Sequence, residues 1–166
     1  MEASRERAAV PAAIVAALVL LATACLRVHV QRGGGSAASA VSAARDSAAF
    51  REVRELLEHG ARAWNAGDLD GFVSDYAAAA TFVTATRVVR GRAAIRQLYS
   101  RRFEPGATRD SLHFEQLEVD VLGRDELNAI AYYVLQRGDS VTARGPTSLV
   151  MRRMSGRWYI VHDHSS

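Results

Sequence analysis

The chain of 166 residues contains no lysine and a single cysteine. One cysteine cannot form an intramolecular disulfide, so a small secreted scaffold held by disulfides is excluded. All basic residues are arginines, and from Arg45 onward they are nearly balanced by Asp and Glu. A nucleic-acid-binding surface needs clustered positive charge, so this balance predicts no nucleic-acid partner.

Several motifs of common enzyme classes are also missing. The sequence has no G-x-S-x-G nucleophile elbow, no Gly-rich phosphate loop and no dinucleotide fingerprint, so no cofactor is predicted. A hydrophobic content of 49% still allows a real core. The length fits one domain with a short additional segment.

Residues 1–25 have the layout of an export signal, with Arg5 and Arg7 before the apolar run 12–21 and small residues before Cys25. A lone cysteine after small residues resembles the lipobox of bacterial lipoproteins, which implies lipidation at Cys25. An uncleaved membrane anchor is the first alternative, because residues 8–26 carry no charge over nearly the roughly 20 residues that span a bilayer. Plain secretion is the second. All three interpretations predict an exported domain, and the first two anchor it to the cell-envelope membrane.

Residues 26–45 are rich in Gly, Ala and Ser and predict a flexible linker. A helix is expected to begin at Asp46 or Ser47, because apolar residues then recur on one helical face: Phe50, Val53, Leu57, Ala61 and Trp64. The folded domain is therefore predicted to occupy residues 46–166.

The stretch from Trp64 to Tyr99 predicts three further elements. Gly67 ends the first helix, and Asp68 caps a short second helix with one apolar face: Leu69, Phe72, Val73 and Tyr76. Residues 81–85 are β-branched and aromatic and predict a strand. Gly91 then opens a third helix, which buries Ile95, Leu98 and Tyr99.

Four extended segments with short turns complete the chain, at residues 112–122, 127–136, 141–154 and 158–164. Short turns predict antiparallel hairpins. The apolar register shifts within the first segment, which indicates a β-bulge near Glu115. Helices grouped before strands predict an α+β fold with the helices on one face of a curved sheet. The segment 127–136 is apolar on both faces, which predicts a homodimer through the outer face of the sheet.

Two motifs resemble a known family. The corner W-N-A-G-D-L-D followed by G-R-A-A-I-R-Q-L-Y, and the closing W-Y-I-V-H-D-H-S, are similar to the nuclear transport factor 2-like superfamily, in its SnoaL-like and ketosteroid-isomerase-like bacterial branch. The resemblance covers residues 46–166. It implies a cone-shaped fold of about three N-terminal helices packed on a curved, mostly antiparallel sheet, with a pocket at the open end.

The resemblance also allows a test of function. Alignment on the corner and on Gly91 places the general base of a steroid isomerase at Thr84 and its oxyanion Tyr at Gly60, and matching residues 145–148 to the later strand places its second Asp near Ser148. None of these residues can do that work. Steroid isomerase chemistry is therefore rejected, and whether the chain is an enzyme is left open. What the resemblance still implies is a pocket for a small apolar molecule, lined by Trp64, Tyr76, Thr84 and Tyr99. The alternative is a non-catalytic dimerisation or interaction module of the cell envelope.

His162 and His164 are the candidate catalytic residues. They lie two apart in a predicted strand, so both share a face with Trp158 and Ile160 and are expected in the pocket. Two alternatives remain: a structural pair bonded to neighbouring hydroxyls or at a dimer edge, and a zinc site. Zinc needs a third ligand, for which only His113 or Asp163 offers itself, and no metal is predicted.

Overall fold

The computed structural model describes residues 34–166. The export signal, lipidation at Cys25 and the first part of the linker were predicted for residues 1–33 and lie outside the described residues. No helix found between residues 34 and 166 combines the length and the apolar character needed to cross a membrane.

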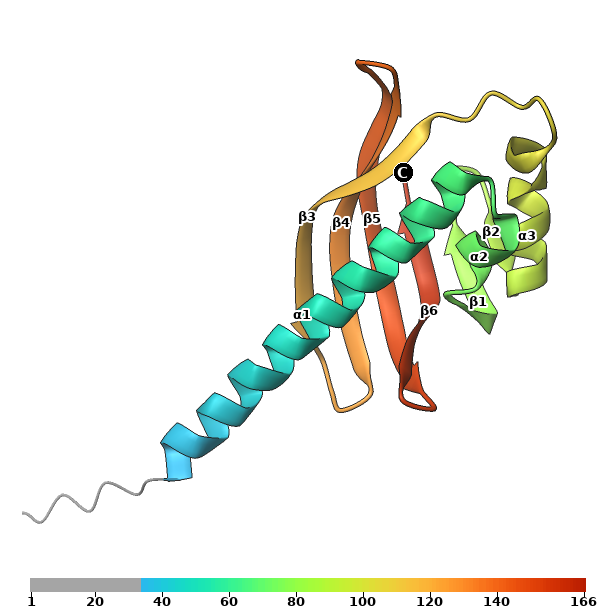
Figure 1. Ribbon diagram of the computed structural model, residues 1–166. Coiled ribbons are helices and arrows are strands. Elements are labelled where there is room, and N and C mark those ends of the chain that lie inside the picture. The colour runs from blue at the N-terminus through green and yellow to red at the C-terminus, as the bar shows by residue number, and fades with distance from the viewer. Residues whose placement is uncertain (1–33) are drawn as a thin grey trace, which may run out of the picture. The chain divides into compact units, whose positions relative to one another are not determined.

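Three α-helices, a 3-10 helix and one six-stranded sheet make up the described residues (Figure 1). The helices are α1 (Gly34–Ala66), α2 (Leu69–Val73), α3 (Arg92–Ser100) and η1 (Arg101–Phe103). The strands are β1 (Tyr76–Val83), β2 (Val88–Arg90), β3 (Ser111–Val121), β4 (Glu126–Arg137), β5 (Ser140–Met154) and β6 (Arg157–Ser165). They lie in the order β2-β1-β6-β5-β4-β3, and only the pair β1 and β6 is parallel among them.

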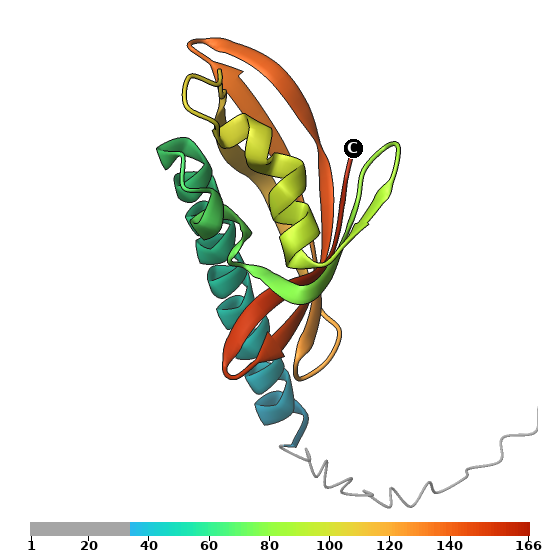
Figure 2. The ribbon, with the colours of Figure 1, turned by 90° about the vertical axis from the view of Figure 1, so that its right-hand side faces the viewer.

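The predicted α+β fold is confirmed. Figure 2 shows the sheet curving around α1 and α3, which lie on its concave side. The four C-terminal strands lie within a few residues of their predicted bounds. The bulge is confirmed as well, because the pairing of β3 with β4 shifts between Glu115 and Glu118, and Gln116 has a positive φ of 54°.

The start of the first helix was predicted too late. α1 begins at Gly34 rather than at Asp46 or Ser47, so residues 34–45 are helical where an irregular linker was expected. Ala is the strongest helix former, and a helix already nucleated by packing extends through Ala-rich sequence at little cost. Residues 39–47 are exposed and lie on the part of α1 that projects beyond the sheet (Figure 1).

The second helix was predicted too long. Asp68 caps α2 by accepting a 2.8 Å hydrogen bond from the N–H of Gly71, but α2 ends at Val73. Tyr76 instead begins β1, which starts earlier than the strand predicted at residues 81–85. The cause is the run 77–80, four alanines with no strand preference of their own that become strand by pairing in the sheet. The short strand β2 was not predicted.

The end of α1 is fixed to the beginning of β3 by two side chains. The indole Nε1 of Trp64 donates to the carbonyl of Asp110 at 2.8 Å. The amide of Asn65 donates to the carbonyl of Leu112 at 3.0 Å and accepts from its N–H at 2.7 Å. These hydrogen bonds hold the end of α1 against the start of β3, and this contact shapes one end of the cavity described below.

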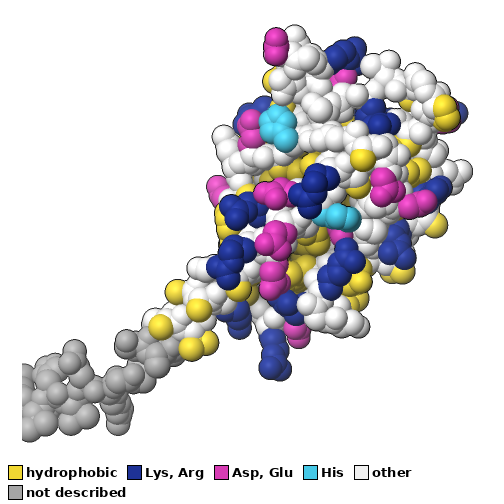
Figure 3. Space-filling model, in the orientation of Figure 1, with side chains coloured by type: hydrophobic (Ala, Val, Ile, Leu, Met, Phe, Trp, Pro, Cys, Tyr) yellow, Lys and Arg dark blue, Asp and Glu magenta, His cyan; other side chains and the backbone are white. Residues whose placement is uncertain are grey.

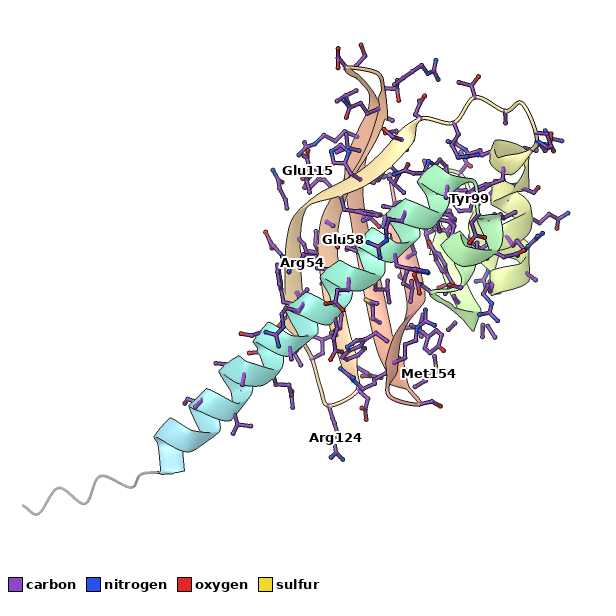
Figure 4. All side chains as sticks on the ribbon, viewed as in Figure 1. Arg54, Glu58, Tyr99, Glu115, Arg124 and Met154 are labelled. Carbon is purple, nitrogen blue, oxygen red and sulfur yellow. The ribbon has the colours of Figure 1, made fainter. Side chains whose placement is uncertain are left out.

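The core lies between α1 and the concave face of the sheet and contains the fully buried Val53, Ile95, Leu127 and Met151. The outer face of α1 is charged, with Arg54 and Glu58 in an i,i+4 pair at 3.9 Å (Figure 4). Figure 3 shows that arginines and acidic side chains are interspersed on this face rather than gathered by sign.

Candidate functional site

A cavity of about 290 Å³ lies between the concave face of the sheet and the helices. Aliphatic and aromatic side chains from α1, α2, β3, β4, β5 and β6 form most of its wall, among them Leu56, Leu57, Phe72, Leu112, Phe114, Leu135, Leu149 and Ile160. Its volume is near the lower limit of ligand pockets, which hold roughly 300–1,000 Å³. The space therefore fits a molecule of one or two rings.

The helical side of the cavity is an aromatic cluster. The ring of Trp64 meets Phe72 edge-on at 5.2 Å and Tyr99 at 6.0 Å, and Phe72 meets Tyr99 at 5.0 Å. Tyr99 also stacks on Phe82 of β1 at 5.8 Å. Figure 4 marks Tyr99 where α1, α2 and α3 converge. Such edge-to-face contacts fix the rings, so this wall is preorganised for a flat apolar ligand.

Asp163 is an almost completely buried polar residue of the cavity wall. Asp163 on β6 accepts a 2.5 Å hydrogen bond at Oδ2 from the hydroxyl of Tyr76. Its Oδ1 accepts from Ser165 at 2.7 Å and from Thr147 at 3.2 Å. All four residues line the cavity, and we call them the polar centre. Three hydroxyl donors hold the carboxyl group in one orientation, as a buried acid requires.

Burial determines the titration of the polar centre. It raises the pKa of Asp163 above its ordinary value, although the three hydroxyl bonds act in the opposite direction. It also raises the pKa of Tyr76 well above that of a free phenol, and the neighbouring Asp163 raises it further. A carboxyl group with a raised pKa beside a phenol can accept a proton from a bound molecule or return one to it.

Tyr99 supplies a hydroxyl with no hydrogen-bond partner within residues 34–166. Burial raises its pKa, and the charge of Asp163 raises it further, so the two groups lie within electrostatic reach of each other. Both line the cavity. The unpartnered hydroxyl can therefore donate to a molecule that occupies the cavity.

A second buried carboxylate, Asp75, also lines the cavity. Its Oδ2 lies 2.8 Å from Nδ1 of His59, and its Oδ1 accepts from the guanidinium of Arg157. Both oxygens are thus held by groups of the protein, and these contacts link α1 through Asp75 to the start of β6. We assign Asp75 a structural role.

The structure brings together three of the six residues predicted to line the pocket. Trp64, Tyr76 and Tyr99 line the cavity, whereas Thr84 does not. The hydroxyl of Thr84 accepts from the N–H groups of Thr86 and Arg87 and donates to the carbonyl of Arg87, so it closes the turn after β1.

The predicted position of the two histidines was wrong. His162 lies on the outer side of the sheet, with its Nδ1 2.6 Å from the hydroxyl of Thr81, and His164 is exposed. The pairing of β6 with β5 shifts here, because Ile160 faces Met151 and His162 faces the next residue, Val150. Val161 is an extra residue without a partner, so the alternation of faces reverses after it. Asp163 and Ser165 consequently take the cavity face.

Reasoning from the sequence therefore missed Asp163, Thr147 and Ser165. A signal for Asp163 was present, since Asp is depleted in strand interiors and stands here inside an apolar strand. No three His, Cys, Asp or Glu side chains in the described part of the chain are placed to hold a metal ion.

Comparisons with solved structures find the same fold. A nuclear transport factor 2-like protein of unknown function from Shewanella oneidensis is 23% identical, with a TM-score of 0.63 over 70% of this chain and 97% of its own. A nuclear transport factor 2-like protein of unknown function from Pseudomonas putida is 26% identical, with a TM-score of 0.60 over 72% of this chain and 87% of its own. A Catenulispora acidiphila protein in complex with S-DNPA is 19% identical, with a TM-score of 0.61 over 72% of this chain and 94% of its own.

The comparison with curated proteins found no match. The Shewanella protein is matched over nearly its whole length, so that protein consists almost entirely of this fold. The family model of the SnoaL-like domain matches residues 53–166, which is more than half of the chain. The chain therefore belongs to the SnoaL-like domain family of the nuclear transport factor 2-like superfamily, and at the level of that family it is a small-molecule-binding domain.

Proposed function

We propose that this chain is an exported, membrane-anchored domain that binds one small, largely apolar molecule in a cone-shaped pocket, with the cavity as its interior. The observation that carries the proposal is the combination of an aromatic wall and a buried polar centre in one cavity of about 290 Å³. Most ligand pockets have this composition, in which apolar surface supplies affinity and a few polar groups fix orientation.

The hydrogen-bonding capacity of the polar centre indicates which polar group the ligand carries. Oδ1 of Asp163 already accepts two hydrogen bonds, whereas Oδ2 accepts one, from Tyr76. A carboxylate oxygen has two lone pairs, so Oδ2 can accept one more bond. The hydroxyl of Tyr99 can donate one. A ligand hydroxyl suits both groups, since it donates to Asp163 and accepts from Tyr99.

Binding is the function proposed, and no reaction is assigned. The position of a steroid isomerase base corresponds to Thr84, which closes a turn outside the cavity. Asp163 is the group of the cavity that could move a proton, because its pKa is raised by burial.

The export and anchoring part of the proposal is supported by the sequence of residues 1–25 alone. Its arginines, apolar run and small residues before Cys25 have the order of a lipoprotein signal. A lipid at Cys25 would keep the domain at the membrane, where small apolar molecules concentrate.

The binding proposal can be tested by filling the cavity. Gly60 lines the cavity, and a Cβ built on it meets no atom within 4 Å. The variant Gly60→Leu should place an isobutyl group in the ligand space, while Gly60→Ala adds only a methyl group and is the matched control. The probe is 2-naphthol, which combines two rings with one hydroxyl.

The measurement is the melting temperature with and without probe. A ligand that binds only the folded state raises the melting temperature by mass action. We expect 2-naphthol to raise it for the wild type and for Gly60→Ala, but not for Gly60→Leu. An equal response of Gly60→Leu and the wild type would show that the probe binds elsewhere, and the proposal would then fail.

A further inference from the structure

We propose that Arg102 is a carboxylate-binding residue at the rim of the cavity, and that the ligand is a small ring-containing monocarboxylic acid whose hydroxyl end reaches the polar centre. This inference rests on the proposed binding function and specifies its ligand class.

Arg102 is placed at the rim by the element that contains it. It is the middle residue of η1, directly after α3, and its side chain lines the cavity although the residue is exposed. Its guanidinium lies over the ring of Trp64, 5.9 Å from the centroid, which holds the cation against the aromatic wall. The buried Asp163 marks the interior of the same cavity, so the cavity has a polar group at depth and a cation at its rim.

The guanidinium of Arg102 has no carboxylate partner among residues 34–166. Asp110 is near enough for Arg102 to contribute to lowering its pKa. The oxygens of Asp110 are nevertheless engaged by Arg137 at 2.6 Å and by Thr142 at 2.6 Å. Arg102 is thus a cation that keeps its hydrogen-bond donors available beside an apolar cavity.

Tyr99 connects the two polar ends of the cavity. Asp163 raises the pKa of the Tyr99 phenol, and Arg102 acts on it in the opposite direction. The hydroxyl therefore lies within the electrostatic reach of both groups. A ligand lying along the aromatic wall past Tyr99 would meet a cation at one end and the polar centre at the other.

The chemistry of these two ends defines the ligand class. A guanidinium presents a planar fork of N–H donors that matches a carboxylate, and such charge-assisted bonds are stronger than neutral ones. The cavity itself accepts one or two rings. A hydroxylated aromatic or alicyclic monocarboxylate satisfies the rim, the wall and the polar centre together.

Four probes separate these contributions because they share one ring system. They are 6-hydroxy-2-naphthoate, 2-naphthoate, 2-naphthol and naphthalene. Titration calorimetry for the soluble probes and fluorescence for naphthalene give their affinities for residues 34–166, a fragment that contains the whole matched domain. Arg102→Gln removes the cation, Arg102→Lys keeps the charge without the fork, and Arg101→Gln is the matched control, since Arg101 is the adjacent exposed arginine and does not line the cavity.

We expect 6-hydroxy-2-naphthoate to bind the wild type about tenfold more tightly than 2-naphthol, as one charge-assisted contact allows. Arg102→Gln should abolish this preference, Arg102→Lys should retain part of it, and Arg101→Gln should leave it unchanged. Melting temperatures of all variants confirm that they are folded.

Two negative results have different meanings. If 2-naphthol and naphthalene bind but the two acids bind the wild type and Arg102→Gln with equal affinity, the inference is wrong and the proposed binding function stands. If no probe binds the wild type, both the inference and the binding function are overturned. If Arg101→Gln and Arg102→Gln lower the affinity for the acids equally, the effect comes from the general positive charge of this surface, and the inference is also overturned.

Discussion

The hydroxyl of Tyr76 donates a 2.5 Å hydrogen bond to Oδ2 of Asp163, a residue 87 positions later in the chain. Tyr76 begins β1 and Asp163 lies near the end of β6, and these two strands are parallel neighbours in the sheet. The bond is buried and lies at the cavity wall. It therefore links the first and last strands of the domain at the point where a ligand would bind.

Removal of the Tyr76 hydroxyl should destabilise the folded domain. Tyr76→Phe leaves a lone pair of the buried Asp163 unsatisfied, and we expect the free energy of unfolding to fall by about 1–3 kcal/mol. Tyr99→Phe is the control, because the Tyr99 hydroxyl has no hydrogen-bond partner in the described residues, and its loss should change stability by less than about 0.5 kcal/mol. Urea unfolding measures both. Equal losses in the two variants would contradict the assignment of the hydrogen bonds.

The raised pKa of Asp163 predicts a pH-dependent difference between the wild type and Asp163→Asn. Below about pH 3.9 the carboxyl group is protonated in the unfolded state as well as in the folded one. Between that pH and the higher pKa of the folded state, the folded protein binds more protons than the unfolded chain. The stability of the wild type therefore decreases as the pH rises through this window.

Asn at position 163 does not titrate in this range. The free energy of unfolding of Asp163→Asn minus that of the wild type should therefore become more positive between about pH 3 and pH 7. Urea titrations at several pH values, with the two proteins measured side by side, give this difference directly. A difference that stays constant or changes in the opposite direction would show that the folded-state pKa is not raised.

Gly60→Ala should stabilise the domain in the absence of ligand. Gly60 lies in the interior of α1, and an added methyl group meets no atom within 4 Å. Glycine in a helix interior costs roughly 0.5–1 kcal/mol relative to alanine, and this cost should be recovered. Thermal unfolding of the two proteins measures the gain. A lower melting temperature would mean that the space beside Gly60 is filled.

Anchoring is tested at Cys25, which lies outside the described residues. We expect Cys25→Ala to move the protein from the detergent phase to the aqueous phase in a phase-separation assay, because stable anchoring of lipoproteins depends on their acyl chains. The assay is read together with the mass of the N-terminal peptide. A variant that stays with the membrane and keeps an uncut N-terminus would favour the transmembrane anchor.

We also propose that the domain forms a homodimer through the outer face of the sheet. Ile130 and Val150 are exposed apolar residues on the central strands β4 and β5. Ile130→Glu should convert the dimer to a monomer, since it places a charge in the contact. Val141→Glu is the control, because Val141 is exposed near the turn between the same two strands. Light scattering of residues 34–166 measures the molar mass of the wild type and of both variants. A monomeric wild type at high micromolar concentration would contradict the proposal.

The fold could be predicted from the sequence because its signals are local. The Gly67 and Asp68 corner, the glycine turns between the last strands and the register shift near Glu115 each depend on a few neighbouring residues. The extent of α1 and the start of β1 could not, because the residues there are mainly alanines. Alanine takes its structure from the packing of its neighbours, and that packing is not visible in a single sequence.

The candidate site was predicted only in its aromatic part. Trp64 and Tyr99 lie on helical faces that the spacing of apolar residues reveals. The polar part depends on one extra residue, Val161, which reverses the alternation of faces along β6. As a result Asp163 and Ser165 face the cavity, and His162 and His164 do not. A bulge of this kind is set by the partner strand, so the alternation of residues within β6 gives no sign of it.

The two hydrogen bonds between the Asn65 side chain and the Leu112 backbone have a consequence for solubility. β3 is an edge strand of the sheet, and the N–H and C=O of Leu112 would otherwise be free to pair with a strand of another molecule. The Asn65 amide occupies both groups as a neighbouring strand would, so the end of α1 closes this part of the edge to aggregation.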